Sequence, residues 1–107
     1  MPTVRLSDTA RAFVQQEANY LRERNPNAAE NFLERLREAR RNLARHPEIG
    51  RPSRIPLRGL RWLVVGEYIL DYDLAADRVE IVAIRHGRQQ DPFIISDPDL
   101  DFETDVN

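Results

Sequence analysis

The most constraining feature of this chain is the stretch between residues 57 and 88, which predicts three short strands joined by tight turns. Between residues 67 and 74, alternate side chains from Tyr68 to Leu74 are apolar or aromatic and share one face, the pattern of a sheet with one buried side. The neighbouring strands are predicted over residues 60–65 and 78–85. Because such short turns join antiparallel strands, the stretch predicts a small antiparallel sheet.

A two-residue turn at residues 76–77 fixes the expected register of the last two strands. The register predicts three facing pairs: Tyr72 with Ile81, Leu70 with Ala83, and Glu67 with His86. His86 is therefore expected to lie beside a carboxylate of the next strand.

Two amphipathic helices are predicted before this sheet. A short strand over residues 3–6 leads to Ser7, a favoured N-cap residue, and apolar residues then recur at helical spacing to about residue 24. Asn25 and Pro26 end this helix and start a second one, which stops near residue 46 because Pro47 follows. The order β-αα-βββ predicts an α+β fold, with a helical hairpin packed on the small antiparallel sheet.

Charge divides the chain into two parts. Residues 1–90 carry all 16 basic residues, every one an arginine, against 12 acidic residues, whereas residues 91–107 carry six acids and no base. We therefore expect a single domain over residues 1–95 and a flexible acidic tail over residues 96–107. No stretch approaches the roughly 18 apolar residues of a membrane span, so the cytoplasm is the expected compartment.

The first candidate site is a group of arginines from two segments. Its members flank the first and last strands of the stretch: Arg51, Arg54, Arg58, Arg61, Arg85 and Arg88, with His86 among them. If those strands lie near one another, the guanidinium groups form a patch that binds phosphate or carboxylate. The alternative is a solvated surface on which Arg58 or Arg61 pairs with Asp71 or Asp73.

The second candidate is His86, whose ordinary pKa suits a general acid or base. The alternative is a strand-end histidine paired with Glu67. No second acid or base lies close to His86 in the sequence, so a complete nuclease site is not visible. His46, just before Pro47, is interpreted as a helix C-terminal residue.

Other classes of site have little support in the sequence. Cysteine is absent, and two distant histidines with scattered acids give no metal-ligand spacing. Neither a P-loop nor a GxGxxG motif occurs, so no cofactor is expected. The acidic tail is either a solubilising end or a segment that folds back over the arginines, and in the second case deleting residues 97–107 should increase affinity for a target.

Several short segments, in this order and spacing, carry a family likeness. They are Pro26-Asn27-Ala28-Ala29, Pro47-Glu48-Ile49-Gly50-Arg51-Pro52, Leu57-Arg58-Gly59-Leu60-Arg61, the strand from Tyr68 to Tyr72, Val79-Glu80-Ile81 and His86-Gly87-Arg88. With them the chain resembles the RelE/ParE superfamily of toxins from bacterial type II toxin–antitoxin pairs, and it is closer to the ParE branch. The likeness extends to about Asp91.

The resemblance implies a compact toxin that a cognate ParD-like antitoxin neutralises. ParE-type members inhibit DNA gyrase by direct binding, without catalysis, and the residues then expected to bind the target are Arg58, Arg61, Arg85, His86 and Arg88. No sequence-specific nucleic-acid binding is expected. In a RelE-type member, which cleaves messenger RNA on the ribosome, His86, Arg61 and Arg85 would instead be catalytic.

Some residues depart from the family pattern. Asp73 and Gln89 stand where ParE relatives often have arginine, which leaves the gyrase activity open and admits a non-toxic remnant that only binds antitoxin. Lysine is absent, and no tyrosine lies near His86 in the sequence, which counts against an endonuclease. The prediction is therefore a ParE-like gyrase inhibitor, with a RelE-like endonuclease as the alternative.

Overall fold

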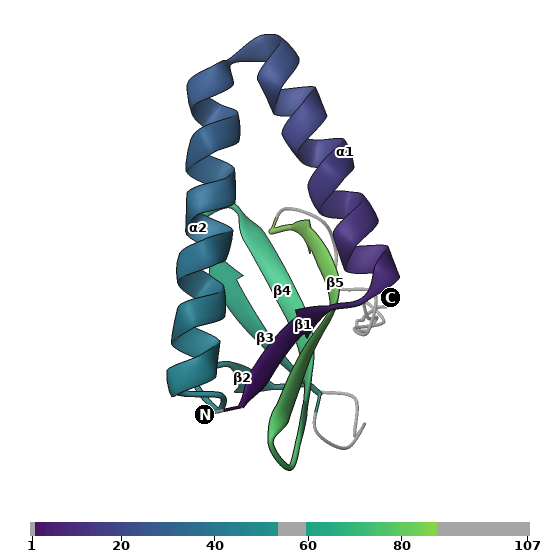
Figure 1. The fold of residues 1–107 in the computed structure, drawn as a ribbon, viewed down its shortest axis with the longest axis vertical. Helices are drawn as coiled ribbons and strands as arrows, with labels where there is room; N and C mark the ends of the chain where they lie inside the picture. Colours follow the sequence, from purple (N-terminus) through teal and green to yellow (C-terminus); the bar gives the residue numbers. More distant parts are fainter. Residues whose placement is uncertain (1, 54–59, 88–107) are drawn as a thin grey trace, which may run out of the picture.

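The computed structural model describes residues 2–53 and 60–87, and in these ranges two helices cover one face of a five-stranded sheet (Figure 1). The elements in chain order are β1 (Thr3–Leu6), α1 (Asp8–Arg24), α2 (Pro26–Arg45), β2 (Arg51–Pro52), β3 (Leu60–Val65), β4 (Tyr68–Ala75) and β5 (Arg78–His86). Predictions concerning Arg54, Arg58, Arg88 and the acidic tail lie outside the described residues.

The α+β architecture with a helical hairpin on the sheet is as predicted. The structure also gives the order and the directions of the strands. The strand order is β1-β5-β4-β3-β2, with antiparallel pairing from β2 through β5. β1 pairs with β5 in parallel, so the sheet is mixed rather than purely antiparallel. The parallel pairing is possible because the long αα connection carries the chain away from β1 before the meander begins. The two-residue strand β2 was not predicted.

The register of β4 and β5 was correctly predicted at one end only. Tyr72 faces Ile81 as expected, but a β-bulge between Asp71 and Tyr72 shifts the remaining pairs by one residue. Leu70 therefore faces Ile84 instead of Ala83, and His86 faces Tyr68 instead of Glu67. At a β-bulge, two residues of one strand lie opposite a single residue of the other strand. A register counted from the turn alone does not predict such an extra residue.

Ser7 links the bulge to the start of α1. Its hydroxyl donates to the carbonyl of Val82, the extra residue of β5, at 2.9 Å, and accepts from the N–H of Ala10 at 3.0 Å. The Ser7 N–H donates to the Ile81 carbonyl at 2.9 Å. The N-cap predicted from sequence thus also fixes α1 against the irregular part of β5.

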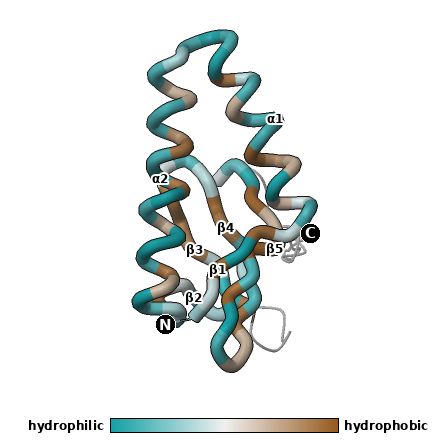
Figure 2. The backbone as a smooth tube through the Cα atoms, viewed as in Figure 1, coloured by the Kyte–Doolittle hydropathy of each residue, from teal (hydrophilic) through white to brown (hydrophobic). Residues whose placement is uncertain are grey.

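The helical hairpin is specified locally. The Asn25 side chain accepts hydrogen bonds from the N–H groups of Asn27 and Ala28, and Pro26 occupies the first helical position, as predicted. α2 ends at Arg45, with His46 as its C-cap. Apolar residues recur along both helices and the strands (Figure 2).

The core lies between the hairpin and the sheet. The helices contribute buried alanines, with Phe32, Leu36 and Leu43 from α2, and the sheet contributes Tyr68, Leu70, Tyr72, Val79, Ile81 and Ile84. Among the described residues, no helix is long and apolar enough to cross a membrane.

Candidate functional site at the end of β5

Arg85 and His86, two of the residues predicted to bind the target, end β5 and point to opposite faces of the sheet because side chains alternate along a strand. Arg85 lies on the face away from the helices. Its Nε and Nη2 donate to the two carboxylate oxygens of Asp71, at 2.8 and 3.0 Å, and the two side chains are only 8% and 3% exposed. This is a buried, bidentate ion pair.

The ion pair gives Asp71 a partner that the sequence did not indicate. The expected partners of that carboxylate were Arg58 or Arg61. The observed arrangement comes from diagonal neighbours on β4 and β5, since Asp71 faces Ala83 and Arg85 faces Ile69. The guanidinium of Arg85 is thereby held inside the protein by an acid of its own chain.

His86 lies on the helix side, where Glu17 and Tyr68 meet it. The Tyr68 hydroxyl donates to Glu17 Oε2 at 2.6 Å, and His86 Nε2 lies 3.6 Å from the same oxygen. The rings of Tyr68 and His86 have centroids 5.1 Å apart, and the edge of Phe13 packs near both. We call Glu17, Tyr68 and His86 the acid–base cluster.

The environment of the acid–base cluster keeps Tyr68 protonated. Burial, and then the hydrogen bond to Glu17, raise the pKa of Tyr68 well above its ordinary value. Its hydroxyl is therefore a permanent donor at neutral pH, and it stabilises a carboxylate that α1 carries into a largely buried position.

A hollow of about 380 Å³ opens beside the cluster and gives it access to solvent. Phe13, Gln16, Glu17, Tyr20 and His86 line it, and 39% of the His86 side chain is exposed. His86 and Glu17 therefore face the hollow, whereas Tyr68 does not line it.

Arg61 lies in a different part of the sheet. Its Nη1 donates to the carbonyls of Gly50 and Glu48, at 2.7 and 3.3 Å, in the loop after α2. Arg61 faces Tyr72 on β4 whereas His86 faces Tyr68, a separation of four residues, or about 13 Å along the strand. The fold therefore does not bring Arg61 and His86 to one point.

The loop held by Arg61 also depends on Tyr72. The Tyr72 hydroxyl donates to the Pro47 carbonyl at 2.8 Å and accepts from the Gly50 N–H at 2.9 Å. A Cβ on Gly50 would lie 2.6 Å from that hydroxyl oxygen, so only glycine fits this approach. Arg61 and Tyr72 therefore bind the same loop, and the structural role of Arg61 is to hold that loop against β3.

Sequence reasoning did not assign Glu17 or Tyr68 to the site, and it paired Asp71 with Arg58 or Arg61 instead of Arg85. Glu17 did carry a signal, because it interrupts the apolar stripe of α1 between Val14 and Ala18. The absence of a tyrosine near His86 in the sequence was misleading, since pairing of β4 with β5 places Tyr68 directly opposite. In the ranges described, no group of acidic or histidine side chains is arranged to hold a metal ion.

A helical hairpin on a five-stranded sheet of this topology is the architecture of RelE/ParE toxins. The chain aligns with the structure of a chromosomal ParDE system from P. aeruginosa at a TM-score of 0.66, with 19% identity, over 80% of this chain and 96% of that one. It aligns with the RelBE2 toxin–antitoxin complex from Mycobacterium tuberculosis at a TM-score of 0.58, with 27% identity, over 79% of this chain and 90% of that one.

Sequence comparison assigns the family. Residues 4–91 match the model of the ParE toxin of the type II toxin–antitoxin system parDE, and the chain belongs to this family. It is 36% identical over 78 residues to the "Putative toxin Y4kP" of Sinorhizobium fredii, covering 71% of this chain and 78% of the relative. It is 40% identical over 69 residues to Toxin RelE2 of Caulobacter vibrioides, covering 64% of this chain and 76% of that one. The protein is thus a type II toxin of the RelE/ParE superfamily.

Proposed function

We propose that this toxin inhibits DNA gyrase by direct binding, without catalysis, and that a ParD-like antitoxin neutralises it in the cytoplasm. The observation that carries the proposal is the match of residues 4–91 to the ParE toxin family. The target-binding surface would include His86, the half-buried Arg61 and the predicted Arg58 and Arg88, whereas Arg85, only 8% exposed, would support it from inside through its ion pair with Asp71.

Among the residues that the structure describes, the chemistry around His86 supports a binding role over a nuclease role. Cleavage of a phosphodiester needs cationic groups beside the acid and base, to stabilise charge on the phosphate. Arg85, next to His86 in sequence, points to the other face and binds Asp71. Arg61 is bound to the loop after α2. Neither guanidinium is oriented toward the acid–base cluster.

One observation favours the second candidate, a RelE-like messenger-RNA endonuclease. The acid–base cluster supplies the partners of His86 that were missing from the sequence, with Glu17 Oε2 3.6 Å from His86 Nε2. In that reaction Glu17 and His86 would be the two acting groups, and a ribose 2′-hydroxyl would lose its proton to one of them as it attacks phosphorus. The other group would protonate the departing 5′-oxygen.

An antitoxin partner agrees with the structural neighbours, which are a ParDE system and a RelBE complex. Docking of an amphipathic, acidic segment on the apolar and basic surfaces of the toxin would couple folding of that segment to tight binding.

The deciding experiment is induction of the toxin without antitoxin, followed by measurement of gyrase-linked DNA breaks and mapping of transcript ends. Gyrase inhibition predicts DNA breaks with intact transcripts. Transcript cuts in phase with codons would replace the proposal with the endonuclease. Normal growth with retained antitoxin binding would identify a non-toxic module.

The substitution Glu17→Gln sharpens this experiment. Glutamine can still accept the Tyr68 hydrogen bond through its amide oxygen, but it cannot take up a proton at neutral pH. A gyrase inhibitor should keep its toxicity, whereas an endonuclease that uses Glu17 should lose roughly 100-fold or more in cleavage rate. Circular dichroism and thermal unfolding of the variant check that the fold is retained.

A further inference from the structure

The outer edge of β3 leaves one residue with unpaired backbone groups. The Leu60 carbonyl accepts from the Ser53 N–H at 3.0 Å, so Leu60 directs its backbone groups away from β4. Because these groups alternate in direction along a strand, Trp62 and Val64 also direct theirs away from β4. The short strand β2 pairs with Arg61 and Trp62 only, and in the described part of the sheet no strand lies beside Val64.

The side chains at this edge are apolar and open to solvent. Val64 is 59% exposed, more than any other large hydrophobic residue that the structure describes, and Ile49 is 41% exposed. Both line a hollow of about 340 Å³, together with Leu63, Val65 and residues of α2, which runs past β3 (Figure 1). Exposed apolar side chains beside an unpaired strand edge are typical of a surface that binds another chain.

Two side chains of opposite charge border the same hollow. Arg35 and Glu38 lie on the side of α2 that faces β3, and both are exposed. Arg35 covers the turn after β3, since its Nη1 would lie 3.1 Å from a Cβ on Gly66. Glu38 follows three residues later, about 4.5 Å further along α2 and therefore beside β3 itself.

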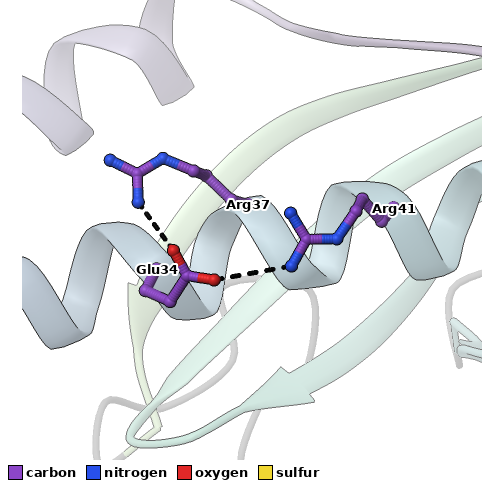
Figure 3. A network of polar contacts seen from close by, with 3 residues as sticks. All are labelled: Glu34, Arg37 and Arg41. Atoms are coloured by element: carbon purple, nitrogen blue, oxygen red, sulfur yellow. Dashed lines mark hydrogen bonds and ion pairs between the residues drawn. The ribbon is translucent and has the colours of Figure 1, made fainter.

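These two charges differ from the other charges at the middle of α2. Glu34 is already bound within the helix, by Arg37 at 2.8 Å and by Arg41 at 3.5 Å (Figure 3). Among the residues that the structure describes, neither Arg35 nor Glu38 has an ion-pair partner. The border of the hollow thus presents one base and one acid that can pair with another molecule.

We propose that the outer edge of β3 joins two copies of this chain around a two-fold axis at Val65. Val64 of each copy lies opposite Gly66 of the other, and the backbone N–H and C=O groups of Val64 pair with the neighbouring strand. The two sheets then continue into one. Arg35 of each copy faces Glu38 of the other, because Arg35 lies beside Gly66 and Glu38 lies beside β3.

The position of the axis follows from β2. A pairing that set Val64 opposite Val64 would place Gly66 of one copy opposite Trp62 of the other, where Arg51 already pairs. An axis at Val65 keeps the turn clear of β2. It also sets Val64 opposite a residue of the same alternation, so that outward backbone groups meet one another.

The charges favour a second copy over another kind of strand. A surface that presents one base and one acid is complementary to itself under a two-fold axis. A uniformly acidic segment would meet the carboxylate of Glu38, and a uniformly basic segment would meet the guanidinium of Arg35. The inference goes beyond the proposed function and depends on neither gyrase nor the antitoxin.

Sedimentation equilibrium of the full chain without antitoxin tests the association. The chain should dimerise as its concentration rises, and Val64→Lys, which places a charge at the centre of the edge, should weaken dimerisation by about tenfold or more. The matched control is Ala76→Lys, at an exposed position in the turn between β4 and β5, which should change it by less than about twofold. A chain that stays monomeric at millimolar concentration, or equal effects of the two substitutions, overturns the proposal.

Exchange of the two charges tests the orientation of the copies. Arg35→Glu and Glu38→Arg should each weaken dimerisation by about threefold to tenfold, since each sets like charges opposite one another. The double variant Arg35→Glu/Glu38→Arg restores opposite charges and should dimerise within about twofold of the wild type. If the losses add in the double variant, the proposed pairing is wrong. Circular dichroism and thermal unfolding check that each variant is folded.

Amide hydrogen exchange at low and high protein concentration locates the contact. The Val64 N–H should exchange about tenfold more slowly in the dimer, whereas the Val65 N–H, which is directed toward β4, should change little. A dimer in which Val64 exchanges as fast as in the monomer would show that the copies meet at another surface, and the proposal would fail.

Discussion

Arg85 and His86 are neighbours in sequence, yet their environments differ in almost every respect. Arg85 is buried in a two-point ion pair with Asp71 on the far face of the sheet. His86 is partly exposed on the helix face, beside a carboxylate that already holds the Tyr68 hydroxyl. The comparison shows that consecutive basic residues in a strand do not form one surface, because their side chains point to opposite faces of the sheet.

The comparison also separates two kinds of polar burial. The Asp71–Arg85 pair places two full charges away from water, where each depends on the other. The acid–base cluster places one carboxylate and one neutral hydroxyl in partial contact with solvent through His86. The first arrangement should matter mainly for stability, whereas the second leaves the His86 side chain 39% exposed to solvent.

The largest predicted effect is that of Arg85→Ala, which leaves the carboxylate of Asp71 buried without its cation. We expect a loss of about 3–5 kcal/mol in the free energy of unfolding, measured by chemical denaturation. The double variant Asp71→Leu/Arg85→Met, which removes both charges, should recover most of that loss. If Arg85→Ala costs under about 1 kcal/mol, the ion pair is not the structural feature described here.

A smaller loss is expected for Tyr68→Phe on the opposite face. Removing the hydroxyl deprives the Glu17 carboxylate of its 2.6 Å hydrogen bond, which should cost about 1–3 kcal/mol in stability. Tyr20→Phe is the matched control, because Tyr20 is 50% exposed and should change stability by less than about 0.5 kcal/mol. Equal effects of the two substitutions would contradict the assigned role of Tyr68.

Alkaline pH provides a third test of the acid–base cluster. Because the pKa of Tyr68 is raised by folding, its contribution to stability is complete below its ordinary pKa of about 10 and is lost as the pH rises above that value. At pH 11 the wild type should have lost about 1 kcal/mol through this group. Tyr68→Phe should lose correspondingly less between pH 9 and 11, and parallel curves for the two proteins would argue against the shift. Tyr72, whose pKa is also raised by burial, contributes a similar loss to both proteins.

The smallest effect is expected for His86→Gln. The side chain is 39% exposed and its distance to Glu17 is long for a hydrogen bond, so stability should change by about 0.5 kcal/mol or less in thermal unfolding. Toxicity measured on the same variant then reports contact with the target and not folding. A loss of stability as large as that of Arg85→Ala would remove the distinction between the two faces.

Much of the fold was predictable because its signals are local. Ser7, Asn25 and Pro26 mark the helix boundaries by capping groups a few residues away, and the short turns predict the antiparallel meander. The bulge was not predictable. It is stabilised by the hydrogen bond from the Ser7 hydroxyl to Val82, between residues 75 positions apart.

The candidate site was predictable only in part, for the same reason. The sequence indicated His86 and its arginine neighbours, and it offered Glu67 as the partner of His86, which the observed register does not bear out. Glu17 reaches His86 because α1 crosses this end of the sheet, and Tyr68 faces it because the bulge shifts the register by one residue.

By itself the sequence determined the order of elements, the helical hairpin, the strand meander and the likeness to toxins, since each depends on periodicity, caps or short motifs. Only the tertiary structure decided which charges are internal and which face a partner. The side of the sheet on which a side chain lies, and the residue of another element that meets it, depend on register and on packing between segments far apart in the chain.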